Sequence, residues 1–194
     1  MSVLAKAEIK RRLLLNIDDP GSLVISPILN ETQFDADSVD LRLGTFFLSS
    51  RRDRIDCFRV DSSDPKYYQE EKYVPFHDKH DYILGPHDSV LAVTFEYIKI
   101  PNDLCDQVIT RSSFGRLFLT IATATWVHPG FRGCLTLELV NYSNFAIALK
   151  PGLAVGQLIF FKVNIDREEL EDRYIRGNYI GATRPEFPKF NKEG

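Results

Sequence analysis

Short runs of alternating apolar and polar residues recur along most of the chain and predict a protein built mainly from β-strands. The alternation is clearest in residues 38–44 (SVDLRLG), 89–100 (SVLAVTFEYIKI) and 135–140 (LTLELV). In a strand every second side chain points to the same face, so a period of two is typical of a half-buried strand. Further strands are expected in residues 23–29, 82–84, 106–110, 117–122, 146–149 and 154–163. Many short strands separated by Gly and Pro favour an all-β sandwich or distorted barrel, since closing a sheet removes its exposed edges.

The N-terminal segment has a different period. In residues 3–15, Leu4, Ile9, Leu13 and Leu14 recur among Lys and Arg at helical spacing, before a strong turn signal at residues 18–21 (DDPG). This pattern predicts a short amphipathic helix. Its basic face could bind anions, but a solvated helix face is the more common outcome.

Two segments lack a regular pattern. Residues 49–80 are polar and irregular, and we expect an excursion with short strands around residues 55–60 and 72–76. Residues 166–194 begin with a charged run (DREELEDR) and continue with Gly, Pro and spaced aromatic residues. Such a tail is either disordered or folds over a site or a neighbouring subunit. We therefore expect one domain over residues 1–165, with an insertion at 49–80, and a tail over 166–194 that could act as a lid.

Composition and charge narrow the class of protein. The 194 residues are 44% apolar and 26% charged, which is ordinary for one globular domain that buries roughly 70% of its extended-chain surface. A net charge of −3 gives no reason to expect nucleic acid or an anionic membrane as a partner, so any phosphate-binding surface must be local. We see no secretory signal and no membrane span. Three widely spaced cysteines, Cys57, Cys105 and Cys134, suit reduced thiols in a cytoplasm.

A basic, hydroxyl-rich turn is the first candidate site. Residues 111–116 (RSSFGR) place two guanidinium groups and two hydroxyls around Gly115. Arginine makes bidentate contacts with phosphate oxygens, and hydroxyl and backbone N–H groups can complete the cradle. The alternative is a turn with surface ion pairs.

The second candidate site is a strand that follows a Gly- and Pro-containing turn, residues 126–133 (WVHPGFRG). Phe131 offers a flat apolar face that could support a sugar or a base, although such a residue is more often part of the core. In the strand, Glu138 shares a face with Thr136 and Val140. If this strand lines a cavity, the carboxylate projects into it from a rigid element and can transfer protons; otherwise Glu138 is a surface carboxylate. Gln157 is a plausible reader of a base edge.

Two other sets of charged or metal-binding residue types are better explained by structure than by function. Asp40 and Arg42 are two residues apart on a predicted strand, and we expect a surface ion pair of small worth. His77, His80 and His87 lie near Asp78 and Asp81. They lack the spacing of a helical metal site, so loop histidines are the better interpretation.

Several motifs in order resemble one family. RSSFGRLFLT, HPGFRGCLTLELVN and LKPGLAVGQLIF are similar to the dCTP deaminase branch of the dCTP deaminase/dUTPase superfamily, as are SVDLRLG and VLAVTFEYIKIPNDL upstream. The resemblance covers residues 38–161. It implies a distorted jelly-roll or β-barrel of the dUTPase-like type with a short N-terminal helix, assembled as a homotrimer with its sites at subunit interfaces. It also implies Mg²⁺ accompanying the nucleotide triphosphate and no zinc, and the chain has no H-x-E paired with P-C-x-x-C, the signature of zinc-dependent deaminases.

The resemblance also implies roles for individual residues. Glu138 would be the general base and acid in deamination of deoxycytidine triphosphate, Ser112 would orient the attacking water and Arg116 would stabilise developing charge. The other residues implied in substrate binding are Arg111, Ser113, Phe114, Gly115, Ala124, His128, Phe131, Thr136, Leu137, Gln157, Tyr174 and Tyr179.

Three departures from the family pattern keep alternatives open. His128 stands where the dUTPases and the bifunctional deaminase-dUTPases carry Asp, which, together with Glu138, favours deamination without efficient diphosphatase action. The segment between Arg116 and Pro129 is one residue shorter than in typical deaminases, and Ala182 stands where the lid pattern has Gln. The leading hypothesis is a dCTP deaminase that makes dUTP and ammonia. The alternatives are a dUTP diphosphatase, alone or coupled to deamination, and a non-catalytic deoxynucleotide-binding module.

Overall fold

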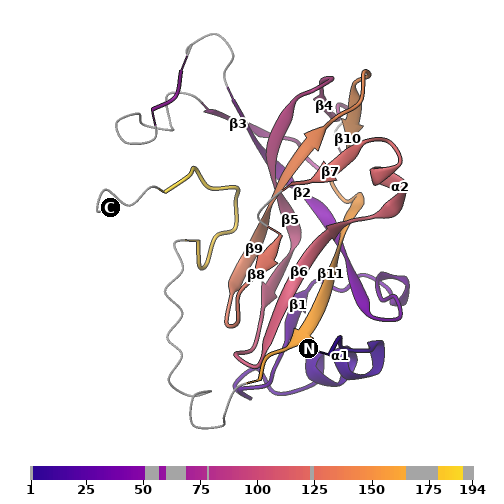
Figure 1. Cartoon of the computed structure of the whole chain (residues 1–194), viewed down its shortest axis with the longest axis vertical. Coiled ribbons are helices and arrows are strands. Elements are labelled where there is room, and N and C mark those ends of the chain that lie inside the picture. The colour runs from indigo at the N-terminus through magenta and orange to yellow at the C-terminus, as the bar shows by residue number, and fades with distance from the viewer. Residues whose placement is uncertain are drawn as a thin grey trace.

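A computed structural model describes residues 2–50, 57–59, 69–77, 79–122, 125–164 and 179–189. It is built mainly from strands, with a short helix near the N-terminus (Figure 1). The elements are, in chain order, α1 (Lys6–Leu13), β1 (Val24–Ser26), the 3-10 helix η1 (Glu31–Gln33), β2 (Ser38–Ser50), β3 (Gln69–Tyr73), β4 (Tyr82–Leu84), β5 (Ser89–Lys99), β6 (Leu104–Thr110), α2 (Ser112–Gly115), β7 (Leu119–Ile121), β8 (Trp126–Val127), β9 (Arg132–Asn141), β10 (Ile147–Leu149) and β11 (Ala154–Lys162).

One large antiparallel sheet makes up most of the fold. Its strand order is β7-β9-β5-β2-β11-β6-β8, with β1 added beside β5 and β3 beside β2, and β4 and β10 form a separate pair. The long strand β2 belongs to both halves: residues 38–42 pair with β11, and residues 43–50 pair with β5 and β3. The register between β2 and β5 shifts between Leu43 and Phe47, where a bulge lets the strand bend. The sheet thus curls on itself, which confirms the prediction of a mainly β, barrel-like fold.

The alternation of apolar residues explains where the core lies. Leu135, Leu137 and Leu139 of β9 are buried, whereas the residues between them are half-buried. Leu41 and Leu43 of β2 and Phe160 of β11 are completely buried in the same core cluster. Because the two halves of the curled sheet face each other, a single set of inward-pointing side chains serves both.

The predicted and observed elements differ in detail. The helix is shorter than residues 3–15, since Val3 is extended and forms an isolated bridge with Phe161. The expected strand around 55–60 is not found in its described residues, 57–59, and the other expected strand is shifted to Gln69–Tyr73. The sequence pattern gives no signal for α2 or β8, which are only four and two residues long.

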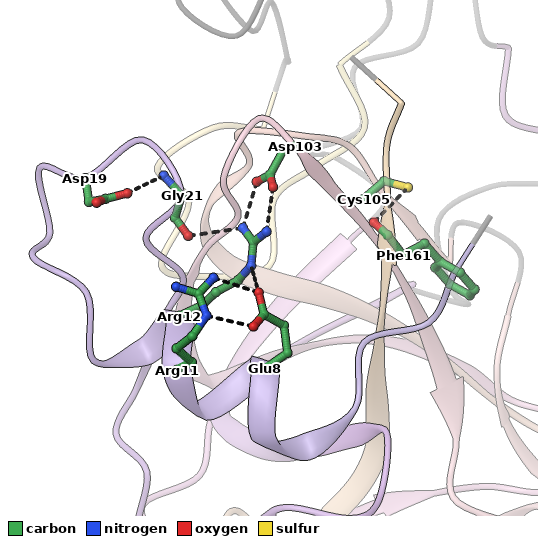
Figure 2. Close-up of polar contacts among 8 residues, drawn as sticks. All are labelled: Glu8, Arg11, Arg12, Asp19, Gly21, Asp103, Cys105 and Phe161. Atoms are coloured by element: carbon green, nitrogen blue, oxygen red, sulfur yellow. Dashed lines mark hydrogen bonds and ion pairs between the residues drawn. The ribbon is translucent and has the colours of Figure 1, made fainter. Parts of the chain in front are cut away.

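The helix α1 is held to the sheet by an almost fully buried arginine (Figure 2). Arg12 is 5% exposed, so the expectation of a fully solvated basic face is wrong. Its Nη1 and Nη2 donate to the two carboxylate oxygens of Asp103 at 2.8 and 2.6 Å, and Nε donates to Glu8 at 3.0 Å. Nη1 also donates to the carbonyl of Gly21 at 3.2 Å. The fork of a guanidinium suits this set of acceptors, which ties α1 to the turn before β6.

The interpretation of Arg42 and Asp40 as a surface ion pair is also wrong. Arg42 is buried, and its Nη1 donates to Glu96 Oε1 at 3.0 Å. Glu96 is completely buried and also accepts from the Arg42 backbone N–H at 2.9 Å and from Gln33 Nε2 at 3.1 Å. Burial raises the pKa of Glu96, and the contacts with Arg42 oppose that shift. Such a pair is retained inside a protein only when hydrogen bonds replace the lost water.

Two findings bear on the setting of the protein. Within the described residues, no helix has the length and apolar character that a membrane span requires. Cys57, Cys105 and Cys134 are free thiols.

Candidate active site

A cavity of about 740 Å³ lies against one face of the curled sheet and is the candidate active site. Its floor comes from β9, β5, β2 and β3, one side comes from residues 121–122 and 126–131, and another wall comes from the segment 179–189. The volume is within the range of small-molecule sites. The residues that line it are Leu48, Ser50, Gln69, Ser89, Val90, Leu91, Val108, Ile121, Ala122, Trp126, Val127, His128, Phe131, Cys134, Leu135, Thr136, Leu137, Glu138, Leu139, Val140, Tyr179, Ile180, Ala182, Glu186 and Pro188.

Strand register places the carboxylate of Glu138 on the floor of this cavity. Glu138 pairs with Leu91 of β5, which in turn pairs with Leu48 of β2, and directly paired residues of an antiparallel sheet point to the same face. Glu138 is half-buried, and its carbonyl accepts from the N–H of Ala122 at 2.7 Å. The acid therefore projects from a strand paired on both sides, which is the rigid setting that proton transfer requires.

The turn before β9 supplies the side of the cavity. His128 is exposed and Phe131 is half-buried against the core, and the N–H of Phe131 donates to the carbonyl of His128 at 3.2 Å. Gly130 has a φ of +73°, a conformation that glycine adopts without strain. The expected flat apolar face of Phe131 is thus part of both the cavity and the core edge.

The described part of the tail forms one wall of the cavity in its own chain. The N–H of Gly181 donates to the Arg132 carbonyl at 2.6 Å, and the N–H of Cys134 donates to the Ala182 carbonyl at 2.7 Å. Gly133 lies between them with a φ of +142°, and a Cβ there would be 2.8 Å from the Ala182 carbonyl oxygen. A residue other than glycine at 133 would push the tail away from β9.

The basic turn lies elsewhere in the chain. Figure 1 shows α2 at the right of the sheet and the yellow segment 179–189 at the left. Arg111, just before α2, forms an ion pair with Asp40 at 3.2 Å, and its backbone N–H donates to the Val155 carbonyl at 3.0 Å. Ser112 and Arg116 are exposed to solvent.

The structure divides the predicted site residues into three groups. Glu138, Thr136, Leu137, His128, Phe131 and Tyr179 meet at the cavity. Ala124 and Tyr174 lie outside the described residues. The described lining of the cavity includes none of the remaining residues, which are Arg111, Ser112, Ser113, Phe114, Gly115, Arg116 and Gln157.

Gln157 belongs with the basic turn rather than with Glu138. In the sheet it pairs with Asp40 on one side and with Ile109 on the other. Asp40 contacts Arg111, so Gln157 and the basic turn share one region of the surface.

The cavity also contains residues that the sequence analysis missed. Trp126 and Cys134 belong to motifs quoted for their neighbours, and Gln69 comes from the irregular insertion. Alternation along β2 and β5 could have placed Leu48 and Leu91 on one face, but strand order is needed to join that face to Glu138. The sequence contains no comparable signal for Gln69.

Buried acids shape the electrostatics behind the cavity. Asp106 of β6 is completely buried and pairs with Val127, a lining residue, and burial raises its pKa well above the ordinary range. Burial also raises the pKa of Cys134, with a smaller effect in the same direction from Glu96. The Cys134 side chain is thus held as a neutral thiol in the cavity wall.

The described residues offer no metal centre. No group of three or more His, Cys, Asp or Glu side chains is close enough together in them to hold an ion. His77, His80 and His87 are exposed, in agreement with their interpretation as loop histidines.

Comparison with known proteins gives one consistent result. Residues 3–163 match the model of a family described as dCTP deaminase-like. A protein of Methanosphaera stadtmanae named dCTP deaminase, dUMP-forming, is 36% identical over 100% of this chain and 96% of its own length. A dCTP deaminase of Natronomonas pharaonis is 38% identical over 95% of this chain and 92% of its own length.

A solved structure supports the fold. The crystal structure of 2'-deoxycytidine 5'-triphosphate deaminase from Agrobacterium tumefaciens superposes with a TM-score of 0.59 at 20% identity. The match covers 81% of this chain and 46% of that one. The barrel-like architecture is therefore shared with a known fold.

Proposed function

The chain belongs to the dCTP deaminase-like family, and on this premise we propose that it hydrolyses the exocyclic amine of dCTP to give dUTP and ammonia. The observation that carries the proposal is the carboxylate of Glu138, which projects from a paired strand into the cavity. A cavity of about 740 Å³ that is lined by a flat apolar side chain, Phe131, and by the Glu138 carboxylate suits a nucleoside.

The reaction moves both protons of the attacking water, one to N3 of the ring and one to the departing amino group. A water molecule attacks C4 of cytosine and loses its first proton to the Glu138 carboxylate, which passes that proton to N3. The carboxylate then takes the hydroxyl proton of the tetrahedral intermediate and gives it to the amino group, so that the C4–N bond breaks and ammonia leaves as the C4 carbonyl forms. A positioned acid–base group of this kind typically contributes about 10²–10⁴-fold to the rate.

We propose that the site is completed by a second copy of the chain, in a homotrimer. The support is geometric, because the cavity of one subunit contains Glu138 but none of residues 111–116 in its described lining. The triphosphate, together with its Mg²⁺, needs cationic and hydroxyl groups. Ser112 would orient the water, and Arg116 would stabilise the negative charge that develops during attack. No zinc has a part in this proposal.

The test of the reaction is a product assay. Purified protein is incubated with dCTP, ammonia is quantified and the nucleotides are separated by chromatography. Glu138→Gln keeps the size of the side chain but cannot accept the proton, so turnover should fall by about 10²-fold or more. The control is Glu31→Gln, which removes an exposed acid that pairs with Lys6 and is outside the described cavity lining. Undiminished turnover in Glu138→Gln would refute the assigned mechanism.

A second product is favoured by one comparison. The Methanosphaera stadtmanae relative is named as dUMP-forming, which would require loss of diphosphate as well as ammonia. His128 opposes this outcome here, since it stands where the diphosphatase members of the resembled family have Asp. The same chromatogram decides, because dUMP with diphosphate, rather than dUTP, would establish the coupled reaction.

A further inference from the structure

The segment 179–189 is anchored to the sheet at two separate places, and the first anchor is made by the backbone. Gly181 and Ala182 exchange hydrogen bonds with Arg132 and Cys134 at 2.6 and 2.7 Å. This anchor lies at the start of β9, the strand that carries Glu138. By itself it fixes only one end of the segment.

The second anchor is the side chain of Arg184. Its guanidinium lies over the ring of Phe46, 4.2 Å from the centroid, and its Nη1 is 3.3 Å from Glu71 Oε1. Phe46 belongs to β2 and Glu71 to β3, whereas the backbone anchor is on β9. In the sheet, β5 lies between β9 and β2, so the segment must cross the cavity floor to reach both anchors.

The residues around these anchors form a wall of the cavity. Tyr179, Ile180, Ala182 and Glu186 all line it. Movement at Arg184 would therefore move side chains that surround the space above Glu138. Arg184 itself is outside the described lining.

We propose that Arg184 is a positioning residue, which holds the 179–189 wall across the cavity of its own subunit through Phe46 and Glu71. A guanidinium can stack its flat face on an aromatic ring while its edge donates to a carboxylate, whereas a lysine ammonium has no flat face that would allow both contacts in this arrangement. The effect of this clamp on catalysis rests on the proposed deaminase function. The clamp itself does not.

The experiment measures hydrogen exchange in the full-length protein without nucleotide. The reporters are the backbone N–H groups of Gly181 and Cys134, because both donate across the contact between wall and strand. Arg184→Ala should raise their exchange rates by about fivefold, the combined size of one exposed cation–π contact and one surface ion pair. Arg184→Lys should give an intermediate increase. Lys162→Ala, which removes an exposed cation at the end of β11, is the matched control and should leave both rates unchanged.

A double-mutant test and kinetics complete the design. In a Phe46→Leu, Glu71→Gln background, Arg184→Ala should produce no further increase in exchange. In the ammonia assay, Arg184→Ala should raise KM for dCTP about fivefold with a smaller change in kcat, and Arg184→Lys should restore part of the loss. Equal exchange in Arg184→Ala and the parent protein would overturn the clamp. Faster exchange in Arg184→Ala with an unchanged KM would overturn the role of Arg184 at the site. If the parent protein does not deaminate dCTP, the proposed function is refuted, and the exchange rates alone then decide whether the clamp exists.

Discussion

Asp106 shows how much a single buried side chain can do to this protein. It faces the core beside Phe160 and Val127, and neither carboxylate oxygen has a hydrogen-bond partner among the described residues. An unpaired carboxylate in apolar surroundings is costly, so the neutral acid is the favoured form. The cost appears only when the pH is high enough to ionise the same group in the unfolded chain.

We predict that Asp106→Asn flattens the pH dependence of stability. Burial raises the pKa of Asp106 well above its ordinary value of 3.8, so the folded state binds a proton that the unfolded state has already lost. The free energy of unfolding should therefore fall as pH rises above about 4, by up to about 1.4 kcal/mol per pH unit for one proton. Asn keeps the shape and cannot ionise, so this slope should be absent.

Urea unfolding between pH 4 and 8 is the measurement for this variant. Asp37→Asn, at an exposed position, serves as the control and should keep the parent slope. If the free energy of unfolding changes equally with pH in Asp106→Asn and in the parent protein, Asp106 does not titrate in this range.

The local pattern of residues predicted which face of its strand Glu138 occupies, but it did not predict which charged residues are buried in the core. The period of two in residues 135–140 predicts that Glu138 shares a face with Thr136, and the structure places both at the cavity. No local pattern marks Asp106 as buried or pairs Arg42 with Glu96, 54 residues away. Partners of buried charges depend on which strands are neighbours, and that information is not local.

At the scale of elements, the long strands were predictable and the shortest elements were not. The strands β5, β9 and β11 have enough residues for the alternation to be recognised. A two-residue strand such as β8 has no period at all, and α2 is a single helical turn. The apolar spacing predicted the helix α1. Its attachment to the sheet depends on Arg12, which the sequence alone does not distinguish from a surface cation.

We expect α1 to detach when Arg12 is replaced. Arg12→Leu leaves Asp103, whose side chain is 19% exposed, without its bidentate partner, so the free energy of unfolding should fall by about 2–4 kcal/mol. Arg11→Leu, on the same helix but exposed and paired only locally with Glu8 among its described contacts, should cost about 0.5 kcal/mol or less. Chemical denaturation measures the free energy of unfolding of both variants. An equal decrease in the two would show that the buried Arg12–Asp103 pair contributes no more than an exposed pair.

The whole molecule presents the two halves of the proposed site on different surfaces. Glu138 lines a cavity walled by the segment 179–189. Figure 1 shows α2, which ends just before Arg116, on the opposite side of the sheet from that segment. The sequence motifs suggested candidate residues both for the cavity with Glu138 and for the basic turn. The local pattern of the chain does not show how far apart these two groups lie, because their positions depend on the order of the strands in the sheet.

This separation predicts complementation between two inactive variants. Glu138→Gln and Arg116→Ala should each abolish deamination alone. When the two are unfolded together and refolded, random pairing at the interfaces of the proposed homotrimer should restore about a quarter of the parent activity. Separately refolded and then mixed proteins are the control. No recovery in the mixed trimers would mean that one chain builds its site alone.

The strand β2 links the two halves of the sheet mechanically. Residues 38–42 of β2 are hydrogen-bonded to β11, and residues 43–50 to β5 and β3. Unfolding of either half of the sheet would therefore remove part of β2 from the other half. The molecule should consequently melt as one cooperative unit, with no stable half-folded species. Its one tryptophan, Trp126, should report the same midpoint by fluorescence as the whole backbone does by circular dichroism.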